Sequence, residues 1–250
     1  MSEDIGHILG NWKYDPESDI IVRLIDGDGG TGKLQMRIDM GIVQIELDGN
    51  PAGEDVRGFK SWLDFYENKR KRAEGVAGSE FSLGPEDCRR LRREGVQYYY
   101  RYVGLMKLGD FERVTRDTAR NLKLFAFAKK YAAHDVDSWA LDQYRPYVIM
   151  MYSKAMTALV LEREPENGIE KALEILKEGI DGIVAFYHEY DIMSEMDKSI
   201  EFTLLNALRT EYRKTVPESL EDQLKKAVEE ERFEDAAKIR DMMKSQDKQI

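Results

Sequence analysis

Apolar residues alternate with polar ones near the beginning of the chain, a pattern typical of half-buried β-strands. Residues 19–25 are rich in Ile, Val and Leu, and a Gly-rich segment follows. From Leu34 to Met40 every second residue is apolar, and this phase shifts by one position after residues 41–42. A phase shift at a glycine indicates a bulge or a tight turn. We therefore predict a small antiparallel sheet of two or three strands within residues 1–60.

From residue 61 onward the apolar positions recur with a helical period. Ser61 suits the N-cap of a first helix, and Pro85 suits the first turn of a second helix that runs to about Leu108. Gly109 is expected to end that helix, and Asp110 to cap the next one. Pro146 is expected to kink the first of the further helices. These are predicted over residues 137–162, 166–191, 195–214, 218–231 and 233–246.

The middle of the chain is expected to form an irregular helical bundle. Residues 102–122, which include the sequence LKLGDFERV, resemble one tetratricopeptide unit in their small and apolar positions and their Gly-Asp turn. A second, weaker match at residues 169–180 does not continue the repeat of roughly 34 residues that this family requires. We therefore expect a weakly tetratricopeptide-like bundle over residues 61–215.

Residues 220–243 carry the strongest amphipathic pattern, with two helices joined as a hairpin. The residues that share one face of the first helix are Leu220, Leu224, Ala227 and Val228. Those that form one stripe of the second helix are Phe233, Ala236, Ala237, Arg240 and Met243, whereas Ile239 and Met242 form another. An isolated hairpin of about 25 residues is marginally stable. We therefore expect one apolar face to pack within the hairpin and another to bind a further surface.

Charge is spread unevenly along the 250 residues. The chain has 48 acidic and 38 basic side chains and a net charge of −10, which argues against nucleic-acid binding over the whole surface. Residues 69–130, which we term the basic block, reverse this balance with 16 basic and 8 acidic side chains. Two interpretations remain open, a phosphate-binding patch or a solvated face whose charges pair with acidic segments. The candidate nucleic-acid ligands are Arg89, Arg90, Arg92 and Arg93.

Tyr98, Tyr99 and Tyr100 follow these arginines, and their rings are candidates for stacking on bases. Three consecutive helical residues point in directions about 100° apart. At least one of the three tyrosines is therefore expected in the core.

Enzymatic chemistry finds little support in the sequence. Residues 27–33 read GDGGTGK, which fits the start of a phosphate-binding P-loop, but Leu34 stands where that motif needs a hydroxyl. A Gly-rich turn between two strands explains the same residues. Cys88 lies near an expected helix N-terminus beside arginines, a setting that promotes a thiolate, yet no histidine is near in sequence to act as a base. We predict no enzyme, no catalytic residue, no metal and no cofactor.

The cellular compartment is predicted from what the sequence lacks. One cysteine excludes an intramolecular disulfide, and the N-terminus does not show the residue order of a signal peptide. The longest apolar run, residues 147–161, is shorter than the roughly 20 residues that span a bilayer. We therefore expect a cytoplasmic protein that does not bind membranes.

The C-terminal hairpin resembles the UVR motif, on the sequence from Leu224 through Phe233–Glu234 to Asp241. The UVR motif is the helical hairpin of the UvrB and UvrC subunits of bacterial excision repair, of Clp-type ATPases and of an adaptor of those ATPases. In that family the hairpin is a protein–protein contact module. The resemblance implies that the partner-binding residues are Leu224, Ala227, Val228, Phe233, Glu234, Ala236, Ala237, Ile239 and Arg240.

More loosely, the sequence QMRIDMGIVQIELDG, the LGDFERV helix and this tail are similar to a group of uncharacterised bacterial UVR-motif proteins. We therefore expect a mainly α (α+β) protein with a β unit at residues 1–60, a bundle at 61–215 and a UVR-type hairpin at 216–250. The expected function is a non-enzymatic scaffold or adaptor that recruits another protein, itself bearing a UVR motif, of excision repair or of a Clp protease system. A homodimer and an accessory role in nucleic-acid binding remain alternatives.

Overall fold

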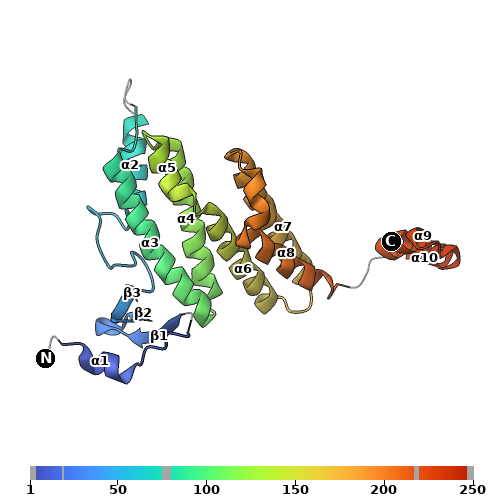
Figure 1. The fold of residues 1–250 in the computed structure, drawn as a ribbon, viewed down its shortest axis with the longest axis horizontal. Coiled ribbons are helices and arrows are strands. Elements are labelled where there is room, and N and C mark those ends of the chain that lie inside the picture. Colours follow the sequence, from blue (N-terminus) through green and yellow to red (C-terminus); the bar gives the residue numbers. More distant parts are fainter. Residues whose placement is uncertain (1–3, 19, 75–79, 217–219, 247–250) are drawn as a thin grey trace. The chain divides into compact units, whose positions relative to one another are not determined.

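The computed structural model describes residues 4–18, 20–74, 80–216 and 220–246, where a small sheet is followed by a series of helices (Figure 1). The helices are α1 (Gly6–Asn11), α2 (Trp62–Glu74), α3 (Pro85–Leu108), α4 (Phe111–Tyr131), α5 (Asp135–Asp142), α6 (Arg145–Arg163), α7 (Ile169–Glu189), α8 (Ile200–Arg213), α9 (Leu220–Glu229) and α10 (Phe233–Gln246). The predicted fold class, mainly α with an N-terminal antiparallel sheet and a C-terminal hairpin, is confirmed. The chain divides into two units, Met1–Ala207 and Leu208–Ile250.

Three strands form one antiparallel sheet in the order β1–β2–β3. They are β1 (Ile21–Asp26), β2 (Gly32–Ile38) and β3 (Gly41–Glu46). A tight turn at residues 39–40 joins β2 to β3, which accounts for the shift of apolar phase in the sequence. Met40 lies at this turn and is 89% exposed, so its predicted place on a half-buried face was wrong.

The Gly-rich residues 27–33 connect β1 to β2, whose ends pair antiparallel through Ile25 and Lys33. Gly29 and Gly30 have φ angles of 81° and 77°, in the left-handed region that glycine adopts without a steric penalty. A P-loop needs a helix after the loop so that its N-terminus faces the phosphates. Here a strand follows, which confirms the predicted hairpin turn.

The segment after α1, a helix that the sequence pattern did not predict, contacts the sheet. The carbonyl oxygen of Trp12 accepts a hydrogen bond from Arg37 Nε at 2.9 Å, and the Arg23 guanidinium lies 4.1 Å from the Trp12 ring centroid. Arg37 and its neighbour Gln35, which the alternation placed on a polar face, are both buried. The N-terminal segment therefore helps to cover a face of β2 that we had expected to be solvated.

The helix caps predicted at three positions are present. Ser61 Oγ accepts the amide of Asp64 at 3.0 Å at the start of α2. Gly109, with φ of 77°, ends α3, and the Asp110 side chain accepts the amide of Arg113 at 3.1 Å to cap α4. The two side-chain caps accept hydrogen bonds from backbone amides that have no partner within the helix, and the glycine lets the chain turn away at the helix end. Local sequence alone therefore sets these boundaries.

Two predicted helices of the bundle require correction. The expected kinked helix at residues 137–162 is two helices, α5 and α6, because Pro146 lies in the first turn of α6 rather than inside a longer helix. Its ring leaves no room for the helical carbonyl four residues earlier. The expected helix at 195–214 begins later, because Ser199 Oγ accepts the amide of Phe202 at 3.1 Å and caps α8. A 3₁₀-helix, Met193–Lys198, precedes it.

The main core lies among α2 to α6, where α3 packs on α4, and α6 on α4 and α7. Its buried residues are Leu63, Tyr66, Leu83, Cys88, Leu91, Leu124, Phe125, Phe127, Ala128, Leu141 and Val148. Tyr98 is 7% exposed, whereas Tyr99 and Tyr100 are 38% and 40% exposed, which confirms that one tyrosine of the run is buried. Among the described residues, no helix has both the length and the apolar character needed to cross a bilayer.

Arg101 of α3 joins the sheet to the helices. Its guanidinium binds Asp117 of α4 through two hydrogen bonds, Nε to Oδ2 at 2.6 Å and NH2 to Oδ1 at 2.9 Å, and both side chains are 1% exposed. Its third nitrogen donates to the carbonyl oxygens of Glu46 and Gly49 at 2.9 and 3.0 Å. A single buried cation therefore holds α4 and the turn after β3 against α3.

Candidate protein-interaction surface

Helices α9 and α10 pack against each other through small side chains. Ala227 is fully buried and Ala236 is 7% exposed, while Leu224 and Ile239 are half-buried. Alanines at a helix contact allow close approach of the two backbones. Ala227 and Ala236, which we had expected to bind a partner, therefore lie inside the hairpin. Ile239 was expected on the same stripe as Met242. It lies three residues after Ala236 and is half-buried, whereas Met242 is exposed.

A tight turn at Glu231 fixes how α10 follows α9. The Arg232 amide donates to the carbonyl oxygen of Ala227 at 2.8 Å, and the Glu231 amide donates to that of Val228 at 3.1 Å. Glu231 has a φ of 56°, in the left-handed region. This is the hydrogen-bond pattern of a Schellman motif, in which glycine is the usual residue at that position. The turn places Phe233 directly at the start of α10.

Several apolar side chains of the hairpin face solvent. Phe233 is 67% exposed, Met242 56% and Val228 50%. Ala237 and Arg240, which follow Phe233 at the i+4 and i+7 positions of one helix face, are also exposed. We term Val228, Phe233, Ala237 and Arg240 the outer surface of the hairpin. Met242 was not among the sequence-predicted site residues, and its position nine residues after Phe233 places it about 180° around α10, on a different side.

Charged groups flank this apolar surface. Arg232 lies between two carboxylates, with Nε 2.8 Å from Glu230 Oε2 and NH1 2.9 Å from Asp235 Oδ2. Glu234, another predicted partner-binding residue, is exposed in the first turn of α10, where the helix dipole favours an acidic side chain. The predicted face positions of Leu220 and Met243 lie outside the described side chains. An apolar centre with a charged rim is the usual anatomy of a protein interface.

A protein-family model for the UvrB/uvrC motif matches residues 216–249. These residues form a UVR motif. No curated protein and no solved structure matches the chain. UVR motifs are known in DNA-repair and Clp-related proteins and mediate protein interactions. The match therefore directs attention to the hairpin as the part of the chain that resembles protein-interaction motifs. The looser similarity of the remaining chain to uncharacterised bacterial UVR proteins stays a prediction.

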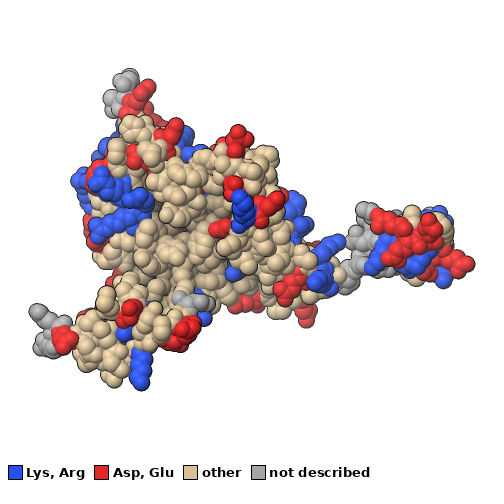
Figure 2. Space-filling model, viewed as in Figure 1, with Lys and Arg blue, Asp and Glu red and all other residues tan. Residues whose placement is uncertain are grey.

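The basic block, which lies outside the UVR hairpin, is partly engaged in ion pairs. Figure 2 shows Lys and Arg gathered over α2 and the first half of α3. Arg89 pairs with Glu86 at 2.9 Å, and Arg90 lies 3.4 Å from Glu86 and 5.0 Å from the Trp62 ring centroid. Arg92 and Arg93 are exposed and form no ion pair within the described part of the chain.

The ion pairs of the block reach elements outside α3. The basic side chains with acidic partners are Arg70, Arg89, Arg90, Arg101, Arg113, Arg116, Arg120, Lys123 and Lys129. Nine of the 16 basic side chains of the block thus have acidic partners, whereas Arg92 and Arg93 have none among the described residues. Both interpretations of the block stay open, and binding of nucleic acid by the four arginines remains a prediction.

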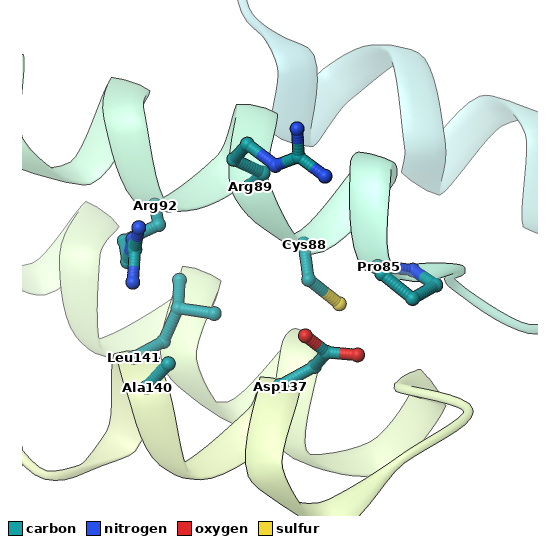
Figure 3. Close-up of a pocket in the computed structure, with 7 residues that line it drawn as sticks. All are labelled: Pro85, Cys88, Arg89, Arg92, Asp137, Ala140 and Leu141. Carbon is teal, nitrogen blue, oxygen red and sulfur yellow. The ribbon is translucent and has the colours of Figure 1, made fainter.

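Cys88 lacks the setting of a reactive thiolate. It lines a cavity of about 110 Å³ between α3 and α5, where its sulfur points toward the Asp137 carboxylate (Figure 3). Burial, helped by the negative charges of Asp137 and Asp87, raises the pKa of the Cys88 thiol to about 11. The thiol is therefore protonated at neutral pH, and the arginines beside it in sequence do not activate it.

Proposed function

We propose that the chain is a non-enzymatic adaptor whose UVR hairpin binds another protein through its outer surface. The observation that supports this proposal is the 67% exposure of Phe233 at the first position of α10. Exposed aromatic side chains with apolar neighbours are the usual anchors of protein interfaces. The proposed partner bears a UVR motif itself and belongs to excision repair or to a Clp protease system in a bacterial cytoplasm. A second copy of this chain is the alternative partner.

The test replaces Phe233 by alanine in the full chain. We expect at least a tenfold loss of affinity for purified UVR-motif proteins of excision repair and of Clp systems, measured by isothermal titration calorimetry. Helicity, measured by circular dichroism, is expected to stay unchanged because the replaced ring is mostly in water. Sedimentation velocity on the same samples separates self-association from binding to another protein.

Met40→Ala is the matched control, because it removes a side chain that is 89% exposed at the turn between β2 and β3. It is expected to bind every partner as the unchanged chain does. The proposal fails when Phe233→Ala binds with unchanged affinity. It also fails when the unchanged chain binds none of these proteins and stays monomeric.

A further inference from the structure

A second surface, in the unit Met1–Ala207, has the features of a ligand site and does not depend on the hairpin. It is a cavity of about 410 Å³, within the range of small-molecule pockets. Five tyrosines from α3, α6 and the loop before α6 line it. They are Tyr99, Tyr100, Tyr102, Tyr144 and Tyr147. We term this the tyrosine cavity.

The tyrosine rings stand at steep angles to one another. The Tyr99 ring centroid lies 5.5 Å from that of Tyr100, 5.6 Å from that of Tyr102 and 6.0 Å from that of Tyr147. The corresponding interplanar angles are 61°, 88° and 54°. These contacts are edge-to-face or tilted pairs that share Tyr99, not a parallel stack. The face of a tyrosine ring attracts a cation that lies within about 6 Å of the ring centroid.

Two residues of opposite charge line the cavity. One is Arg92 of α3. Glu201, in the first turn of α8, also lines the cavity. Burial, followed by Tyr99 and the negative charge of Glu201, raises the pKa of Tyr147 to about 12. A carboxylate and several tyrosine rings therefore line the same cavity.

Glu201 has no cationic partner among the residues that the structure describes. Ser199 Oγ donates a hydrogen bond to its Oε2 at 2.9 Å, and the N-terminus of α8 favours an acidic side chain in this turn. The cavity therefore combines a carboxylate, tyrosine rings whose faces have negative potential, and apolar walls. A compact ion such as Na⁺ loses its hydration there without gaining enough oxygen ligands, whereas an alkylated ammonium is weakly hydrated and suits apolar walls.

We propose that the tyrosine cavity binds an alkylated ammonium group, with the cation enclosed by the rings of Tyr99 and Tyr147 beside the Glu201 carboxylate. The class of ligand is a small quaternary or tertiary amine, or a larger molecule that ends in one. Because Arg92 also lines the cavity, the proposed ligand keeps its positive charge beside the tyrosines and Glu201.

The experiment titrates choline into the full chain and follows tyrosine ring signals by NMR, with 3,3-dimethylbutan-1-ol as the neutral molecule of the same shape. We expect choline to saturate and to bind at least about tenfold more tightly than the neutral alcohol. Glu201→Gln, which keeps side-chain size, is expected to weaken choline binding at least about threefold. Tyr14→Leu, which changes a tyrosine outside the cavity, is expected to leave it unchanged.

Three results would overturn the proposal. Equal binding of choline and the alcohol means that the cavity selects apolar shape alone. Tighter binding of benzoate than of choline means that Arg92 selects an anion. The absence of saturable choline binding means that no ammonium site exists. The comparison of choline with the neutral alcohol uses the unchanged chain, so its result is valid even when a cavity variant fails to fold.

Discussion

Asp48 receives two arginines of the basic block. Arg113 lies 3.1 Å from the Asp48 carboxylate, Arg116 also pairs with it, and Arg116 NH2 donates to the carbonyl oxygen of Leu47 at 2.9 Å. Hydrogen bonds from Arg113 and Arg116 lower the pKa of Asp48 from 3.8 to about 2, although partial burial opposes this shift. These two arginines of the basic block therefore hold a turn of the chain itself.

Asp48→Asn is expected to reduce stability at neutral pH by about 1 kcal/mol, a small value because the Asp48 side chain is 62% exposed and its ion pairs are screened. The folded-state pKa lies below the unfolded one. The carboxylate therefore contributes fully above about pH 4, and this contribution is lost as the pH falls toward 2. Urea unfolding of both proteins across this range is the measurement. A difference in stability that stays constant down to the lowest pH contradicts this assignment.

At the scale of single elements, residues with a local role were predictable and residues with distant partners were not. Ser61, Gly109 and Asp110 act on backbone groups within a few positions, so the sequence reveals them. Arg37 was misassigned because Trp12, whose carbonyl oxygen accepts its hydrogen bond, lies 25 positions earlier. The hairpin was recognisable from its pattern, but which alanines it buries follows from helix rotation and required coordinates.

The turn between α9 and α10 leads to a prediction about hairpin stability. Glu231 adopts a left-handed conformation that costs a side-chain-bearing residue about 1 kcal/mol relative to glycine. Glu231→Gly is therefore expected to stabilise the hairpin by about that amount. Hydrogen exchange of the Arg232 amide, which donates to Ala227, is expected to slow about fivefold.

Glu230→Gly is the matched control for the turn, because it removes the same charge one residue earlier, where φ is not left-handed. Glycine at position 230 increases the conformational entropy of the unfolded chain without relieving any backbone strain, and it removes the ion pair of Glu230 with Arg232. Exchange of the Arg232 amide is expected to become faster in this variant. Equal effects of the two substitutions would show that charge, rather than backbone conformation, limits the turn.

At the scale of the whole molecule, long-range contacts join the parts that the sequence presents separately. Arg101 reaches the carbonyl oxygen of Glu46, 55 residues earlier, and the tyrosine cavity combines α3 with Glu201 of α8. From the sequence alone, Arg101 looks like one more member of the basic block, because it follows the tyrosine run within the same helix. Only tertiary structure shows that Arg101 is buried whereas Arg92 and Arg93 are exposed. The count of charged residues by segment thus predicted that a basic block exists, but not which of its side chains are buried and which are exposed.

The buried pair of Arg101 and Asp117 gives the strongest expected effect on stability. Arg101→Met retains side-chain length but leaves the Asp117 carboxylate buried without its principal cation, which costs about 3–5 kcal/mol. Arg101→Met combined with Asp117→Leu removes both charges and is expected to regain part of this loss, because well-packed apolar residues replace buried ion pairs at little cost. Urea unfolding followed by circular dichroism gives the four stabilities of this double-mutant cycle.

Recovery in the double variant is expected to be incomplete, and the reason lies in the sheet. Arg101 NH1 also donates to the carbonyl oxygens of Glu46 and Gly49, and methionine leaves both of these without that donor. A residual loss of about 1–3 kcal/mol is therefore assigned to the junction between sheet and helices. Asp117→Leu alone leaves the cation buried and is expected to be at least as damaging as Arg101→Met. A double variant no more stable than either single variant contradicts the view that Arg101 and Asp117 act chiefly on each other.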